Sequence, residues 1–195
     1  MNTGYCSFQA ISSSYYSEDP ESGSVGTQPD GFDFDQRMTT ARSTWGASLG
    51  VSFNDVTNRE SANIRAYGGD RHEIRRSINW PFALTATYGA MLPPRRGDFA
   101  ESAGTIQARG IDRSVFRFTG SGDTGLIIAV FTGSARNNTF ATMTAIHELG
   151  HALGYYGHSP NSNDVMTANP PLFSPNETLN SAELEHLRQI YLRFR

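Results

Sequence analysis

Apolar residues first recur at a regular spacing just after residue 32. Four of them fall three or four residues apart, on one face of a helix: Met38, Ala41, Trp45 and Leu49. Immediately afterwards, Val51 and Phe53 alternate with polar residues, as the residues of a strand do. The pattern therefore predicts a helix that leads directly into a strand.

Alternating apolar residues continue through the middle of the chain and indicate further strands. These stretches occupy residues 61–69, 82–92, 103–109 and 114–131. In the first stretch, Ile64 and Ala66 alternate with polar neighbours, and the last stretch divides into two strands around a Gly-rich turn. Five or six strands are therefore expected before the chain returns to a helical pattern.

Two helices are predicted to close the chain. The first begins near Asn138, a residue type that caps helix starts, and ends at Gly154, which suits a left-handed C-cap. The second begins at Asn180, with Glu183 at capping-box spacing. Its apolar face consists of Leu184, Leu187, Tyr191 and Phe194.

The first 31 residues show no such period. Residues 1–31 are rich in Ser and Gly and carry scattered aromatic residues. We interpret them as a leader, linker or propeptide remnant that lies over the surface of the domain. The folded domain is then expected to comprise residues 32–195.

Composition excludes several classes of protein. The chain has 195 residues and a single cysteine, Cys6, so no intramolecular disulfide is possible. A net charge of −3 provides no basic field for nucleic acid, and no apolar run approaches the ~20 residues of a membrane helix. We expect one domain, in a monomer, that binds neither nucleic acid nor a membrane.

A possible metal site lies in the first of the two closing helices. His147 and His151 are four residues apart, so both project from one face of an α-helix. Two imidazoles at this spacing can share one Zn²⁺, and Glu148 beside them can act on a water molecule at the metal. Such an HExxH match also occurs by chance on ordinary helices, and its meaning depends on what accompanies it.

Gly154, His158 and Met166 accompany the motif, and together the six positions resemble the metzincin clan of zinc endopeptidases. The pattern of that clan is HExxHxxGxxH, followed by a methionine turn. The resemblance implies that Gly154 reverses the chain, that a third histidine returns to the zinc, and that Met166 forms an apolar floor beneath it. "FATMTAIHELGHALG" and "LNSAELEHLRQIY" also resemble two helices of the matrix metalloproteinases. The acidic calcium loops and the structural zinc site of the animal enzymes are missing, so a simpler, bacterial relative is expected.

The candidate third ligand, His158, comes one residue later than the third histidine of the family pattern. The family position is occupied by Gly157, and His158 comes next. Met166 lies eight residues beyond His158, as in the matrix metalloproteinases, which restores the register and favours His158 as the ligand. Gly157 can absorb the extra residue with a positive φ. The alternative is that a carboxylate such as Asp164 replaces His158.

The resemblance implies a mixed α/β domain of the α+β type, with the zincin fold of the metzincins. A twisted, mixed five-stranded sheet, the active-site helix and a C-terminal helix would lie around a cleft between upper and lower subdomains. One catalytic Zn²⁺ is expected on His147, His151 and His158, with Glu148 as general base. No calcium site is expected, because the acidic calcium loops of the animal enzymes are missing.

The expected function is that of an endopeptidase that acts on proteins or peptides. It would prefer apolar residues after the cut, because the segment after Met166 contains Pro170, Pro171, Leu172 and Phe173. One alternative is a catalytically silent or latent binding module, for example an adhesin that uses Arg96–Asp98. We expect a secreted or extracellular protein, with no secretory signal in the sequence given. All 16 basic residues are Arg, so a lysine-free protease effector that is delivered into host cells and acts in virulence is the other alternative.

Overall fold

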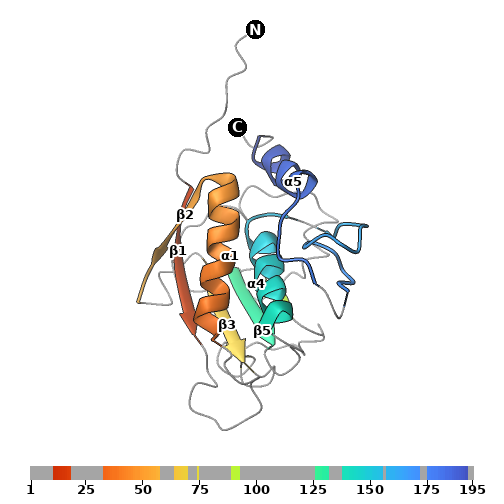
Figure 1. The fold of residues 1–195 in the computed structure, drawn as a ribbon. Coiled ribbons are helices and arrows are strands. Elements are labelled where there is room, and N and C mark those ends of the chain that lie inside the picture. The colour runs from red at the N-terminus through yellow and green to blue at the C-terminus, as the bar shows by residue number, and fades with distance from the viewer. Residues whose placement is uncertain are drawn as a thin grey trace, which may run out of the picture.

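The computed structural model describes the sheet, three helices and the loops around the histidine motif. The described residues are 11–18, 33–57, 64–69, 74, 89–92, 126–131, 138–155, 157–171 and 175–192. Figure 1 shows α1 (Phe34–Leu49) and α4 (Asn138–Ala152) side by side across one face of the sheet, with α5 (Ser181–Leu192) at the end of the chain. No helix among these residues is long and apolar enough to cross a membrane.

Five strands form one mixed sheet. They are β1 (Ile11–Glu18), β2 (Val51–Asp55), β3 (Ile64–Gly69), β4 (Gly89–Leu92) and β5 (Leu126–Phe131). Their order is β2-β1-β3-β5-β4, and every pairing is parallel except that of β4 with β5. Among the strands that the structure describes, β4 is therefore an antiparallel strand at one edge of the sheet.

β1 corrects the interpretation of residues 1–31 as a leader or linker laid over the surface. Residues 11–18 form an inner strand that pairs with β2 on one side and with β3 on the other. The segment was missed because its "ISSSYYSE" sequence is dominated by serine and has no apolar alternation, although main-chain pairing does not depend on that pattern. The rest of residues 1–31 lies outside the described residues.

Helix α1 (Phe34–Leu49) follows the predicted apolar face. Its N-cap is Asp33, whose side chain accepts a hydrogen bond from the backbone N–H of Gln36, and it leads at once into β2. The buried face contains the four predicted residues and the first residue of the helix: Phe34, Met38, Ala41, Trp45 and Leu49. The helix and strand predicted here are confirmed.

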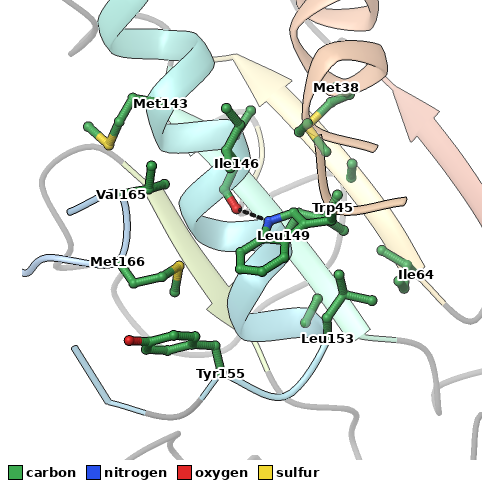
Figure 2. Close-up of a cluster of buried hydrophobic side chains, with 14 of the residues drawn as sticks. Met38, Trp45, Ile64, Met143, Ile146, Leu149, Leu153, Tyr155, Val165 and Met166 are labelled. Carbon is green, nitrogen blue, oxygen red and sulfur yellow. Dashed lines mark hydrogen bonds between the residues drawn. The ribbon is translucent and has the colours of Figure 1, made fainter. Parts of the chain in front are cut away.

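The core lies between α1 and α4 (Asn138–Ala152). The indole N–H of Trp45 donates to the carbonyl oxygen of Ile146 over 2.8 Å, which ties the two helices together in the buried interior (Figure 2). A Cβ added at Gly150 would lie 2.7 Å from Trp45 Cζ2 and 2.6 Å from Met166 Sδ. The two helices and the Met166 turn therefore meet at one tightly packed point.

The other predicted strands have mixed outcomes. β3 and β5 lie within the predicted stretches, and all six residues of β3 are buried, as is typical of an inner parallel strand covered on both faces. β4 is the end of the predicted stretch 82–92, whose earlier residues lie outside the described residues. Residues 103–109 and the first strand of 114–131 also lie outside them.

Candidate metal and catalytic site

Helix α4 carries three of the predicted site residues in its last two turns. His147, Glu148 and His151 are on the helix, and His147 and Glu148 are almost fully buried, with 9% and 6% of their surface exposed. His158 reaches the same place from the loop that follows. One ring nitrogen from each of the three histidines lies within 4.8 Å of the others, so the three could hold one metal ion.

Backbone carbonyl groups fix the orientation of the two helical histidines. His147 Nδ1 lies 2.8 Å from the carbonyl oxygen of Val165, and His151 Nδ1 lies 2.6 Å from that of Tyr155. A carbonyl oxygen can only accept a hydrogen bond, so each Nδ1 carries the proton. Each neutral ring then presents an unprotonated Nε2, the form in which imidazole binds a metal.

The two Nε2 atoms lie 3.0 Å apart. A hydrogen bond between them would require one ring to be doubly protonated. Burial opposes this, because desolvation lowers the pKa of His147 to about 4 and that of His151 to about 3. Nitrogen ligands of a tetrahedral Zn²⁺ are about 3.3 Å apart, given bond lengths of about 2.0–2.1 Å. The pair therefore fits a shared cation.

The loop that brings His158 back contains both predicted glycines. Gly154 has φ 105° and Gly157 has φ 78°, conformations that favour glycine. The loop closes on itself where the backbone N–H of Ser159 donates to the carbonyl oxygen of Met166 over 2.7 Å. Gly157 therefore has the positive φ that was predicted to absorb the extra residue before His158.

Asp164, the alternative third ligand, is engaged elsewhere. Its carboxylate accepts hydrogen bonds from Ser159 Oγ and, over 2.7 and 2.8 Å, from the side-chain amides of Asn161 and Asn180. It is not among the residues that meet at the histidine cluster. The geometry favours His158, and Asp164 instead ties the loop to the start of α5.

Met166 is completely buried in the core against α4 (Figure 2). Its backbone N–H donates to Glu183 Oε1 over 2.7 Å, and Glu183 Oε2 accepts from the backbone N–H of Asn180 over 2.9 Å. Glu183 thus closes the predicted capping box of α5 (Ser181–Leu192) and also holds the turn whose Val165 carbonyl orients His147. The capping box was visible in the sequence, but the contact with the turn was not.

Tyr155 also contributes more than the sequence indicated. Besides its carbonyl contact with His151, its buried ring packs against the exposed His186, with ring centroids 4.3 Å apart. Burial, together with the carboxylates of Glu183 and Asp164, raises the pKa of the Tyr155 phenol. His186 itself is an exposed residue of the last helix.

Some residues for which the sequence predicted a role lie outside the described residues. Leu172 and Phe173 of the expected pocket wall belong to this group, whereas Pro170 and Pro171 before them are half-buried. Cys6 and Arg96–Asp98 also lie outside. The role of Met166 as a floor beneath a metal stays a prediction.

Comparisons with known proteins add little to this geometry. No protein-family model matches the chain, and no curated protein matches it. Among solved structures, the fold is similar to that of myroilysin, with 13% sequence identity, a TM-score of 0.42 and coverage of 92% of each chain. A likeness this distant carries no inference about function, which therefore rests on the site itself.

Proposed function

We propose that this chain is a zinc-dependent endopeptidase of the metzincin type, with the matrix metalloproteinases as its nearest branch. The observation that carries the proposal is the convergence of His147, His151 and His158 within 4.8 Å, next to the buried Glu148. Three histidines with one open position form the ligand set of a catalytic rather than a structural zinc site. Binding alone would not need a carboxylate in that place, which disfavours the silent or adhesive alternative.

Each residue of the site has a defined task. His147, His151 and His158 would hold Zn²⁺, and the carbonyl groups of Val165 and Tyr155 keep the first two rings in the ligand tautomer. When bound, Zn²⁺ supplies a Lewis acid that lowers the pKa of water and polarises a carbonyl group.

The Glu148 carboxylate takes the proton of the attacking water as the new C–O bond forms. It returns that proton to the nitrogen of the departing amine as the C–N bond breaks. Glu148 is on the turn of α4 that also carries His147 and His151.

An extended peptide would bind along β4. Among the described strands, β4 is at the edge of the sheet and pairs with β5 on its inner side, and we propose that its other side accepts one more strand through main-chain hydrogen bonds. Such pairing is insensitive to sequence, so selectivity would come from a pocket. We propose that residues 170–173 form its apolar wall and favour medium-to-large apolar residues directly after the cut.

The proposal also includes a setting for the enzyme. We propose a secreted monomer, without a required calcium ion, and delivery into a host cytosol is the alternative suggested by the absence of lysine. We propose that any propeptide within this chain ends before residue 11, because β1 lies inside the sheet and residues 19–31 connect it to α1.

Zinc content and proteolysis measured on the same samples test the proposal. The wild type should bind one zinc per chain and digest casein, and His158→Ala should lose both properties. Asp164→Asn is the matched control, and it should retain zinc. Loss of zinc from Asp164→Asn but not from His158→Ala would overturn the ligand set.

Mass-spectrometric mapping of cuts in a proteome-derived peptide library tests the pocket. Leu, Ile, Phe or Met should dominate directly after the cut. A dominant charged residue or Gly at that position would refute the apolar wall.

A further inference from the structure

Gly89, the first residue of β4, lies directly against the general base. It pairs with Val130 of β5 and is buried beneath α4. A Cβ added to Gly89 would lie 2.9 Å from both Cγ and Oε1 of Glu148, and 2.7 Å from Cγ2 of Thr144. Real Cβ atoms essentially never approach other heavy atoms within 3.0 Å, so any larger residue would displace one of these groups.

The backbone conformation at residue 89 does not require glycine. Gly89 is not among the described glycines with a positive φ, so an L-residue could adopt its backbone conformation. The requirement is for space alone. Added Cβ atoms at Gly68 and Gly150 would also clash, but they would meet core side chains, Phe34 at Gly68 and Trp45 and Met166 at Gly150. Gly89 is the one of these three that borders the Glu148 carboxylate.

The surroundings of Gly89 cannot move freely. The hydroxyl of Thr144 donates to the carbonyl oxygen of Phe140 over 2.9 Å, which fixes the rotamer and holds the Thr144 methyl group toward β4. On the other side, four residue pairs hold β4 in register with β5. An added methyl group would therefore press on the Glu148 side chain, whose Cγ and Oε1 would both lie 2.9 Å from it.

We propose that Gly89 is a positioning residue that sets where the Glu148 carboxylate sits relative to the edge strand. This inference rests on the proposed endopeptidase function. A peptide added to β4 would have its scissile bond placed by main-chain pairing, and the absent side chain at Gly89 allows the carboxylate to lie next to that strand. Gly89 itself takes no part in the reaction, and it affects only the distance between the Glu148 carboxylate and β4.

The test compares Gly89→Ala with the wild type in zinc content, kcat and KM. Zinc content should not change, because the three atoms nearest to the added methyl group belong to Thr144 and Glu148 and not to the three histidines. We expect kcat to fall about 10–100-fold, since a misplacement of about 1 Å can cost this much. KM should stay within about threefold, because main-chain pairing along β4 is retained.

Two further variants separate positioning from general damage. Gly68→Ala is the matched control, since its Cβ would lie 2.4 Å from the Phe34 ring in the core. It should lower stability yet leave the kcat of the folded, zinc-loaded protein unchanged. Thr144→Ser removes the methyl group nearest to the added Cβ and keeps the hydroxyl, so Gly89→Ala combined with Thr144→Ser should recover part of the lost kcat.

The outcomes that overturn the inference are distinct from failure of the proposed function. If zinc-loaded wild type cuts no peptide, the endopeptidase proposal fails, and the role of Gly89 fails with it. If the wild type is active and Gly89→Ala changes only KM, behaves like Gly68→Ala, or is not rescued by Thr144→Ser, then only the positioning role is wrong.

Discussion

Replacing Glu183 with alanine should destabilise the protein and weaken its zinc binding at the same time. The carboxylate accepts the backbone N–H groups of Met166, over 2.7 Å, and of Asn180, over 2.9 Å. The Met166 N–H is buried and would lose its acceptor, which costs about 1–3 kcal/mol, whereas the half-buried Asn180 N–H can turn to water at a smaller cost. We expect a total loss of about 2–3 kcal/mol in the free energy of unfolding.

Glu185 provides the matched control on the same helix. Its exposed carboxylate accepts a hydrogen bond only from Gln189 among the contacts described, over 2.7 Å, so Glu185→Ala should cost less than about 0.5 kcal/mol. Glu183→Gln retains one acceptor oxygen and should fall between the two alanine variants.

The assay is urea unfolding of each variant without metal, followed by a zinc titration of the folded protein. Glu183→Ala should also bind zinc more weakly than Glu185→Ala, because the turn that orients His147 loses its anchor. Equal unfolding free energies for the two alanine variants would refute the structural role of Glu183. Unequal stability with equal zinc affinity would refute its link to the site.

Three shorter predictions follow from the same structure. Burial raises the pKa of Glu183 above its ordinary 4.5. The stability of the wild type relative to Glu183→Gln should therefore fall as pH rises from about 4.5 toward neutrality. Urea unfolding of both proteins at several pH values measures this difference, and a rise with pH would contradict the prediction. Gly150→Ala should lower the melting temperature, by a strain of about 1–3 kcal/mol, because its Cβ would lie 2.6 Å from Met166 Sδ; an unchanged melting curve would contradict this packing. Chelation of calcium alone, with zinc buffered, should alter neither melting temperature nor rate, because the sequence contains no acidic loop with enough oxygen ligands.

The spacing of apolar residues predicted the helices because the residues that recur every three or four positions form the helix face that packs in the core. Met38, Ala41 and Trp45 are all completely buried, and the pattern identified their helix face without knowledge of its partner. β1 shows the limit of such patterns. Residues 11–18 occupy the sheet through main-chain pairing with both neighbours, and a serine-rich strand gives no apolar signal of that position.

The site was predictable where its residues are close in sequence. The four-residue spacing placed His147 and His151 on one helix face, and the distance to Met166 pointed to His158, which does join the cluster. The carbonyl group of Val165 and the absent side chain of Gly89 could not be predicted. Both act across the fold on residues of α4, and no local pattern specifies such contacts.

The most direct test of the account is the rate of casein hydrolysis by Glu148→Ala and wild type at equal zinc content. The substitution leaves the three histidines and their carbonyl partners in place, so zinc should stay bound at one ion per chain. The rate should fall by about 10²–10⁴-fold, the usual contribution of a positioned acid–base group. Hydrolysis at a rate close to that of the wild type would contradict the assignment of Glu148 as the general base, and with it the proposed mechanism.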